Sequence, residues 1–493
     1  MPISLFRSGL VRPVAISIAM VLLLAGCAST GSLEPHARAL SGDNLSANRS
    51  LDAHKLSTAD FPRQDWWKAL GDPQLDALID EALQGNPSLD AADARLRKAQ
   101  AQSGLAEAAR KPTLSASGQY SGVQLPETLI PAPEGGSYLG STVLMLDFKY
   151  GLDLWGGKRA QWEAAVGQAK AAEIDAQAAR LTLSSNIARA YVGLAQAHAA
   201  LDVANHEHDR ASHLRDLGQQ RVKAGLDNQL QLRQAESTIA SAEQQAQAAQ
   251  QQIDAAHTAI AALMGQGPDR GLDIAHPQVL QAGTPGIPGV LPSELLGHRP
   301  DVVAARWRVE AASRGIDASK ASFKPSINLS AIVGLASAGL SDLFSSDALL
   351  GLGGPAISLP IFDGGRLRSQ LDASDADYDL AVASYNQSLV GALHEVTDAL
   401  QSARSLDQQI DSSKRARAAA QSAWDLAQAR YRAGLGTQLD VLSAQRPLLQ
   451  LDQQIAALQA QRLAAAIDLD RALGGGLVLE QPTTPIANTA VTP

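Results

Sequence analysis

The chain has 493 residues and a formal net charge of -9 at pH 7, and 4% of its residues are aromatic. The negative charge argues against a nucleic-acid-binding protein, which would carry a basic patch, and so few aromatic residues argue against one compact globular core. Long stretches rich in alanine and glutamine instead indicate long helices packed closely side by side.

The N-terminus resembles a bacterial secretory signal. Arg7 and Arg12 accompany an apolar run, Val14 to Ala25, that is shorter than the roughly 20 residues of a membrane-spanning helix. The run ends in Leu24-Ala25-Gly26-Cys27, which resembles the lipobox of bacterial lipoproteins. We therefore expect a signal peptide over residues 1–26 and a lipidated N-terminal segment over residues 27–85.

Cys27 is the only cysteine, so an intramolecular disulfide is impossible. The lipobox resemblance implies a covalent diacylglycerol and an N-acyl lipid at Cys27; the alternative is an incidental cysteine at the end of a signal. Ala28 replaces the aspartate that signals inner-membrane retention in enterobacteria, which resembles outer-membrane sorting. Beyond residue 27 no apolar run reaches about 18 residues, so a mature chain that crosses a membrane must do so as strands of a closed barrel.

An internal duplication organises the rest of the chain. Residues 86–118 align without gaps with residues 299–331, so that Lys111-Pro112 meets Lys324-Pro325. Further matches follow in the same order: Leu154–Lys158 with Phe362–Arg366, Arg221–Leu226 with Arg430–Leu435, and Gly265 with Gly474. We expect a first repeat over 86–268, a linker over 269–298, a second repeat over 299–476 and a flexible tail over 477–493.

Each repeat is expected to hold the same elements. A helix of about 25 residues ends at the Lys-Pro pair, because proline disfavours helix in the preceding residue. Two strands follow, and a Gly-Gly pair opens a long helix that runs to about Leu217 or Arg430. A glycine turn then leads into a last helix of about 39 residues. The long helix would span roughly 93 Å, and the two shorter helices match it if they stack end to end.

The long helices carry apolar residues in steps of four and three. In the first repeat these are Leu183, Ile187, Ala190, Leu194, Ala197 and Leu201, and in the second Leu389, Leu393, Val396, Leu400 and Ala403. This spacing is the a/d pattern of a coiled coil. An ordinary amphipathic helix in a globular bundle is the alternative, but the length and the scarcity of large apolar residues favour an extended wall.

Residues Ser141 to Leu154 alternate between an apolar face and a mostly polar face, which is the pattern of a transmembrane barrel strand. Leu114–Tyr120 and Ile327–Leu335 repeat the pattern. Leu350–Phe362 is a poorer candidate because Pro355 and Pro360 interrupt it. A strand of a soluble sandwich remains the alternative for each segment alone.

Four strands cannot close a membrane barrel, because the known barrels have at least about eight. Two chains would give eight strands, whose interior is filled by side chains, whereas twelve strands from three chains could enclose a passage. The count therefore favours a trimer if the protein conducts anything. The loops Gly122–Gly140 and Ala336–Leu349 would lie at one end of the barrel.

Several motifs together resemble the TolC-like outer-membrane factor family, particularly its lipoprotein branch of the NodT and OprM type. They are Trp66-Trp67 with Gly71-Asp72-Pro73 and Leu75, Asn86-Pro87-Ser88-Leu89, Arg299-Pro300-Asp301-Val302, Asp153–Gly156 and Pro360–Arg366. The resemblance implies a mostly α-helical protein with a membrane β-barrel part, in which a homotrimer forms a 12-stranded barrel on a 12-helix periplasmic tunnel. It also implies passive export, with a periplasmic adaptor and an inner-membrane pump as partners and the outer membrane as the location.

The resemblance also implies two functional regions. Gly225, Leu226, Gly434 and Leu435 lie at helix turns that would contact the adaptor, although a glycine C-cap alone explains such turns. Leu439, Asp440 and Ser443 fall in a segment, Gln438–Arg446, that resembles the constricted periplasmic entrance. Three copies of Asp440 would attract cations, and Ser443, where relatives often carry aspartate, would weaken that field. A solvated carboxylate is the alternative for Asp440.

The sequence offers little support for catalysis or for bound cofactors. His206 and His208 lie on different helix faces, so with His213 they are not expected to bind one metal ion. Gly351-Leu352-Gly353-Gly354 lacks the spacing of a dinucleotide loop, and no nucleophile elbow is present. We therefore expect a protein without enzymatic activity or cofactor. Two other classes remain open: a coiled-coil structural lipoprotein without a pore, and a periplasmic enzyme on a helical scaffold.

Overall fold

The computed structural model describes residues 30, 33–40, 55–57, 62–226, 228–280, 290–292 and 298–477. The predicted signal peptide, Cys27 and nearly all of the predicted tail lie outside the described residues. The chain divides into two compact units. The strand-bearing unit comprises Met1–Ala39, Leu96–Ala172 and Ala305–Tyr385, and the helical unit comprises Leu40–Arg95, Glu173–Ala304 and Asn386–Pro493.

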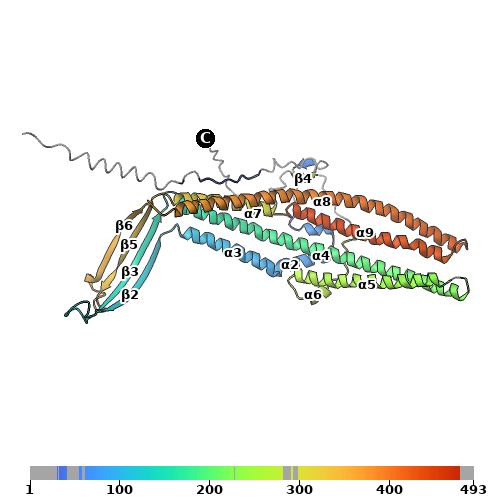
Figure 1. Ribbon diagram of the computed structural model, residues 1–493, viewed down its shortest axis with the longest axis horizontal. Coiled ribbons are helices and arrows are strands. Elements are labelled where there is room, and N and C mark those ends of the chain that lie inside the picture. The colour runs from blue at the N-terminus through green and yellow to red at the C-terminus, as the bar shows by residue number, and fades with distance from the viewer. Residues whose placement is uncertain are drawn as a thin grey trace, which may run out of the picture. The chain divides into compact units, whose positions relative to one another are not determined.

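Helices dominate the described chain (Figure 1). The helices are η2 (Trp66–Leu70), α2 (Pro73–Gly85), α3 (Pro87–Ala108), α4 (Gly157–Lys223), α5 (Gln229–Leu263), α6 (Asp269–Leu272), α7 (Pro300–Ala321), η3 (Ser346–Ala348), α8 (Arg366–Arg432) and α9 (Gln438–Ala472). The strands are β1 (Lys55–Ser57), β2 (Thr113–Gln124), β3 (Tyr138–Leu152), β4 (Val290–Pro292), β5 (Ser326–Ser337) and β6 (Leu349–Ser358). None of the described helices is both long and apolar enough to cross a membrane.

The two repeats contain the same elements with the same helix lengths. α3 and α7 have 22 residues each, α4 and α8 have 67, and α5 and α9 have 35. The predicted order of helix, two strands, long helix and last helix is confirmed. The long helix of the first repeat ends at Lys223 and not near Leu217, because Gly218 stays helical and the backbone reaches a positive φ only after the helix, at Gly225. The last helices are accordingly shorter than the predicted length of about 39 residues.

The strand-bearing unit contains one antiparallel sheet with the strand order β2-β3-β5-β6, visible in Figure 1. The register places Leu144 opposite Leu335 and Leu146 opposite Val333, and Leu114 pairs with Phe148. Because side chains alternate along a strand and directly paired residues share a face, the predicted apolar faces of β2, β3 and β5 lie together on one side of the sheet. The predicted alternation is therefore confirmed for these strands.

The fourth strand, β6, is more regular than the sequence indicated. It runs from Leu349 to Ser358 and contains Pro355, which lies opposite Leu329 of β5. Within one copy, β6 is the last strand in the order of the described sheet and pairs with β5 alone, so Pro355 interrupts no ladder on its other side there. Pro360 and Phe362 follow the strand, so the predicted end at Phe362 was four residues too late.

The helical unit is held together by a core in which the predicted a/d residues take part. Leu183, Ile187 and Leu194 of α4 are buried against Ile260 of α5 and Leu463 of α9, together with residues of η2 and α2. In the second repeat Leu389, Val396, Leu400 and Ala403 of α8 are buried as well. The apolar stripes of both long helices are therefore packing surfaces, as the spacing predicted.

The shorter helices of each repeat meet end to end, as expected. At the junction of the first repeat, Asn86 precedes α3 and its side-chain amide donates to the carbonyl of Leu263 at the end of α5, at 2.5 Å. At the equivalent position of the second repeat, the Arg299 guanidinium donates to the carbonyl of Ala472 in α9, at 3.1 Å. Both contacts satisfy carbonyls that a helix end leaves unpaired.

Candidate functional site: the entrance segment of α9

The predicted entrance segment, Gln438–Arg446, forms the first nine residues of α9. A capping box starts this helix: the Thr437 hydroxyl accepts from the Asp440 backbone N–H at 3.2 Å, and the Asp440 carboxylate accepts from the Thr437 backbone N–H at 2.8 Å. The hydrogen bonds from the Thr437 backbone and hydroxyl lower the pKa of Asp440. The carboxylate is therefore ionised at neutral pH and engaged in starting the helix.

A groove of about 650 Å³ runs beside the entrance segment, between α4, α5 and α9. Leu439, Ser443 and Arg446 line it from α9, because residues three and four positions apart share a helix face. The structure thus brings Leu439 and Ser443 together. Asp440 is not among the described lining residues and occupies the capping box instead.

Arg210 joins α4 to the entrance segment. Its side chain is 4% exposed and donates to the backbone carbonyl of Leu442 at 3.1 Å. The same guanidinium forms a two-point ion pair with Glu207, one helical turn earlier, at 2.5 and 2.7 Å. The carboxylate balances the charge of the arginine, and the remaining N–H holds α9 in place. Sequence reasoning missed this residue because nothing in its helix marks it as a partner of a segment 232 positions away.

Pro447 lies inside α9, directly after the entrance segment. Proline has no backbone N–H, so the helical hydrogen bond to the carbonyl of Ser443, four residues earlier, cannot form. The α9 backbone therefore lacks one interior hydrogen bond at the end of the entrance segment, which makes this the position where the helix bends at least cost.

The predicted adaptor-contact residues lie in two matching turns. Gly225 and Gly434 have φ values of 70° and 71° and end α4 and α8. The following Leu226 and Leu435 donate backbone hydrogen bonds to Arg221 and Arg430, respectively, which is the Schellman pattern of a helix end. Their side chains are 69% and 72% exposed. Both turns therefore present an apolar side chain to the surroundings.

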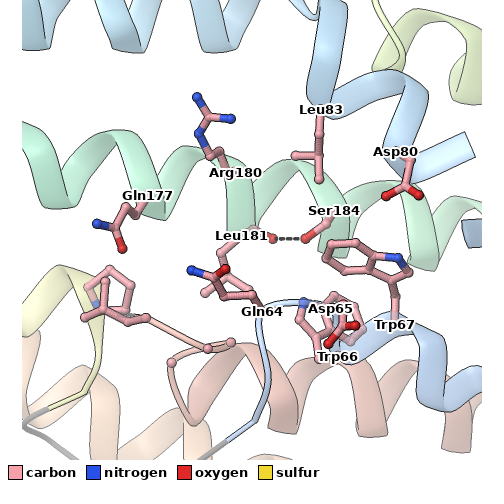
Figure 2. Close-up of a pocket in the computed structure, with 15 residues that line it drawn as sticks. Gln64, Asp65, Trp66, Trp67, Asp80, Leu83, Gln177, Arg180, Leu181 and Ser184 are labelled. Atoms are coloured by element: carbon pink, nitrogen blue, oxygen red, sulfur yellow. Dashed lines mark hydrogen bonds between the residues drawn. The ribbon is translucent and has the colours of Figure 1, made fainter. Parts of the chain in front are cut away.

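The Trp66-Trp67 motif serves packing in the helical unit. Both indoles are buried, and they line a cavity of about 330 Å³ with Leu181 of α4 and the glycines that follow α9 (Figure 2). Nearby, Asp72 starts α2 by accepting from the Gln74 backbone, and its other oxygen accepts from the Tyr191 hydroxyl at 2.9 Å. These motif residues hold the helical unit together around α4.

A histidine cluster that the sequence did not reveal joins three elements of the helical unit. The rings of His198 on α4 and His276 after α6 have centroids 4.3 Å apart, and His257 on α5 lies 6.4 Å from His198. Burial, and then the two neighbouring imidazoles, lower the pKa of His198. Within the described ranges, no three His, Cys, Asp or Glu side chains are arranged to hold a metal ion.

An antiparallel sheet with one apolar face, joined to duplicated long helices that end in glycine turns, defines the class of outer-membrane channels with helical extensions. Solved structures share this fold. The outer membrane protein VceC of Vibrio cholerae matches with a TM-score of 0.77 at 38% identity, covering 85% of this chain and all of that one. The outer-membrane channel OprN matches with a TM-score of 0.78 at 27% identity, covering 92% and 100%.

Sequence comparison identifies the same class of protein. Residues 78–266 and 291–475 match the family described as "Outer membrane efflux protein". The fusaric acid resistance protein FusA of Burkholderia cepacia is 39% identical over 73% of this chain and 68% of its own length. The pyoverdine export outer membrane protein OpmQ of Pseudomonas aeruginosa is 33% identical over 93% and 96%. The chain belongs to the outer membrane efflux protein family, and it is an efflux channel protein of the outer membrane.

Proposed function

We propose that three copies of this chain form one conduit, with a twelve-stranded barrel in the membrane above twelve periplasmic helices. The observation that carries the proposal is the four-stranded sheet, which begins with β2, ends with β6 and has one apolar face. Four strands are too few to close a barrel, and lipid leaves no solvent for open strand edges. Three sheets joined edge to edge remove the open edges and leave room for a passage.

The conduit passively conducts small organic molecules that a periplasmic adaptor and an inner-membrane pump deliver. Relatives are named for fusaric acid resistance, pyoverdine export and multidrug resistance, which supports a cargo of small organic compounds. The adaptor meets the glycine turns, where the exposed Leu226 and Leu435 offer apolar anchors. A pair of matching turns in each copy gives the assembly repeated contacts of modest individual strength.

The entrance of the conduit is formed by the first turns of α9. Leu439, Asp440 and Ser443 from three copies surround the axis there. Asp440 adds negative charge at the rim, while its hydrogen bonds with Thr437 keep the start of the helix rigid. The mature chain is attached to the membrane by a diacylglycerol and an N-acyl chain on Cys27, a residue outside the described ranges.

Native mass spectrometry and planar-bilayer recording of the purified protein test the assembly. We expect a trimer in detergent that gives discrete conductance steps. A water-soluble monomer that is stable without detergent would refute the proposal, and a trimer that never conducts would favour the coiled-coil scaffold. Radioactive palmitate should label the wild type and not Cys27→Ser, and equal label in both would exclude lipid at this cysteine.

A further inference from the structure

We infer that the end of the sheet where the long helices begin binds anionic phospholipids at the periplasmic surface of the outer membrane. This inference rests on the proposed channel function, which places the sheet in the membrane. At this end, which we call the helix end of the sheet, β2 and β5 begin, β3 and β6 end, and α4 and α8 follow the strands. The binding groups are lysine and arginine side chains, which pair with the phosphate of the lipid.

The two ends of the sheet differ in charge. The loops at the opposite end, residues 122–140 and 336–349, have no lysine or arginine and contain Glu127, Glu134, Asp342 and Asp347. At the helix end, every strand has a basic residue within eight positions: Arg110 and Lys111 before β2, Lys158 and Arg159 after β3, Lys324 before β5 and Arg366 after β6. The two ends would face opposite sides of the membrane, and only the helix end carries the charge that anionic phospholipids attract.

Part of the positive charge at the helix end is compensated inside the protein. The cations that face a carboxylate are Arg159 and Arg314 beside Glu163, Lys111 beside Glu107, and Lys320 beside Asp375. Among the described residues, no carboxylate forms an ion pair with Lys158, Lys324 or Arg366. Asp153 and Asp363 accept hydrogen bonds from backbone N–H groups at the starts of α4 and α8. Lys158, Lys324 and Arg366 are therefore the cations that remain to bind an anion from outside.

The packing of α7 on α8 brings two of these cations together. Phe323, which follows α7, belongs to a buried cluster with Leu367 in the first turn of α8. Lys324 and Arg366 are the immediate neighbours of these two residues in the chain, so they emerge on the same part of the surface. Both side chains are exposed.

Trp155, between β3 and α4, joins the third cation to this site. The Lys324 ammonium lies 5.0 Å from the centroid of the Trp155 ring, and the indole N–H donates to the Pro325 carbonyl at 2.7 Å. Lys158, three residues after Trp155, donates to the Gly151 carbonyl of β3 at 3.1 Å and has further hydrogens to donate. A pocket of about 450 Å³ opens beside Trp155 and Lys324 and leaves room for a lipid head group.

Exposed apolar side chains lie next to the cations in the chain. Leu154 precedes Trp155 and is 56% exposed, and Phe362 lies four residues before Arg366 and is 88% exposed. Basic side chains beside apolar ones match a phospholipid, whose charged phosphate lies directly above its acyl chains. Tryptophan is typical of the same depth in membrane barrels.

The N-terminal segment supports this placement of the membrane surface. Leu33 packs against the buried cluster that contains Phe323 and Leu367. Six residues separate Leu33 from Cys27, and an extended chain of that length spans at most about 21 Å. A lipid on Cys27, as proposed above, would therefore enter the membrane close to Lys324 and Arg366.

Native mass spectrometry of the purified trimer in detergent tests the inference, with dioleoylphosphatidylglycerol or dioleoylphosphatidylcholine added in steps. We expect the wild type to bind phosphatidylglycerol at least about tenfold more tightly than phosphatidylcholine, which carries no net charge. Lys324→Gln/Arg366→Gln should weaken binding of phosphatidylglycerol by at least about tenfold, because each basic residue at an anionic membrane surface contributes about fivefold in affinity. Lys324→Arg/Arg366→Lys should retain the affinity of the wild type.

Lys98→Gln/Arg415→Gln is the matched control, because it removes the same two kinds of side chain from exposed positions on α3 and α8 that lie far along the chain from the strands. The inference is overturned if the wild type binds both lipids equally, or if the control loses as much affinity as Lys324→Gln/Arg366→Gln. Displacement of the lipid by excess inorganic phosphate would also overturn it, since it would show a phosphate site that ignores the acyl chains. A conducting trimer with any of these results leaves the channel function intact, whereas a wild type that neither assembles nor conducts would refute the channel itself.

Discussion

Replacement of Arg210 by methionine should release the entrance segment from α4. The guanidinium is 4% exposed, donates to the Leu442 carbonyl at 3.1 Å and pairs with Glu207, which is 18% exposed. Hydrogen bonds from charged donors contribute about 1.5–3 kcal/mol each. The contact with Leu442 is the only one of these that joins α4 to α9, so its loss should shift the equilibrium between held and released α9 by about tenfold to a hundredfold.

Hydrogen exchange of the first turns of α9 measures this shift directly. In Arg210→Met we expect the amides of residues 438–446 to exchange at least about tenfold faster, together with more frequent opening in bilayer recordings. Arg215→Met is the control on the same helix, because among the described residues Arg215 pairs with its exposed neighbour Asp216 and forms no hydrogen bond or ion pair with α9. Such an exposed pair contributes less than about 1 kcal/mol.

A second substitution separates anchoring from unpaired charge. Arg210→Met also leaves the half-buried Glu207 carboxylate without its partner, which by itself destabilises α4. Adding Glu207→Gln should restore part of the global stability but not the protection of residues 438–446. If the double variant recovers both, or if Arg210→Met exchanges like Arg215→Met, the contact with Leu442 does not hold the entrance.

Three further predictions concern stability, measured as denaturant midpoints of the detergent-solubilised protein. Gly434→Ala should lower the free energy of unfolding by about 1–2 kcal/mol, because Gly434 has a φ of 71°. Gly391→Ala inside α8, where a Cβ meets no atom within 4 Å, should raise it by about 0.5–1 kcal/mol. A change of the same sign in both variants would contradict this prediction. Burial lowers the pKa of His198, so the folded state favours the neutral ring, and stability should fall as the pH drops below about 6.5. His198→Gln should reduce this dependence of stability on pH. An unchanged dependence would exclude His198 as its source. Burial raises the pKa of Asp470 to about 7, so the gain in stability from Asp470→Asn should grow from pH 5 to about pH 7 and then level off; a gain independent of pH would contradict it.

The sheet could be predicted because apolar residues at every second position fit a β-strand and few other structures. Once Leu144, Leu146 and Phe148 are placed on one face, a register slip of one residue would turn all of them to the other side. The observed pairing with Leu335 and Val333 keeps every apolar face together. The edge position of β6 could not be predicted, because the order of strands depends on which neighbours pair, and Pro355 argued against a strand until that position was known.

Helix ends and long-range contacts were harder to predict. In stretches rich in alanine and glutamine, a single Gly218 costs only about 1 kcal/mol and does not end a helix of 67 residues. The histidine cluster joins His198, His257 and His276, whose separations follow no local motif. The contact between Arg210 and Leu442 could not be predicted for the same reason. Local chemistry predicted the elements, whereas these contacts depend on which helices become neighbours.

The duplication explains why the two helix tips have equal geometry but different chemistry. Stacked short helices must match the long helix beside them, so neither repeat can change length alone, and the helices of both repeats have equal lengths. The caps carry no such constraint: Asn228 starts α5 by accepting from the Leu230 backbone, whereas a capping box of Thr437 and Asp440 starts α9. Thr238 lies 13 residues after Gly225, and Pro447 lies 13 residues after Gly434. Of these two helices, α9 therefore combines a capping box at its start with a missing backbone hydrogen bond at Pro447, one turn beyond Ser443. We expect any bend of its first turns to occur there, and no bend at the equivalent Thr238 of α5.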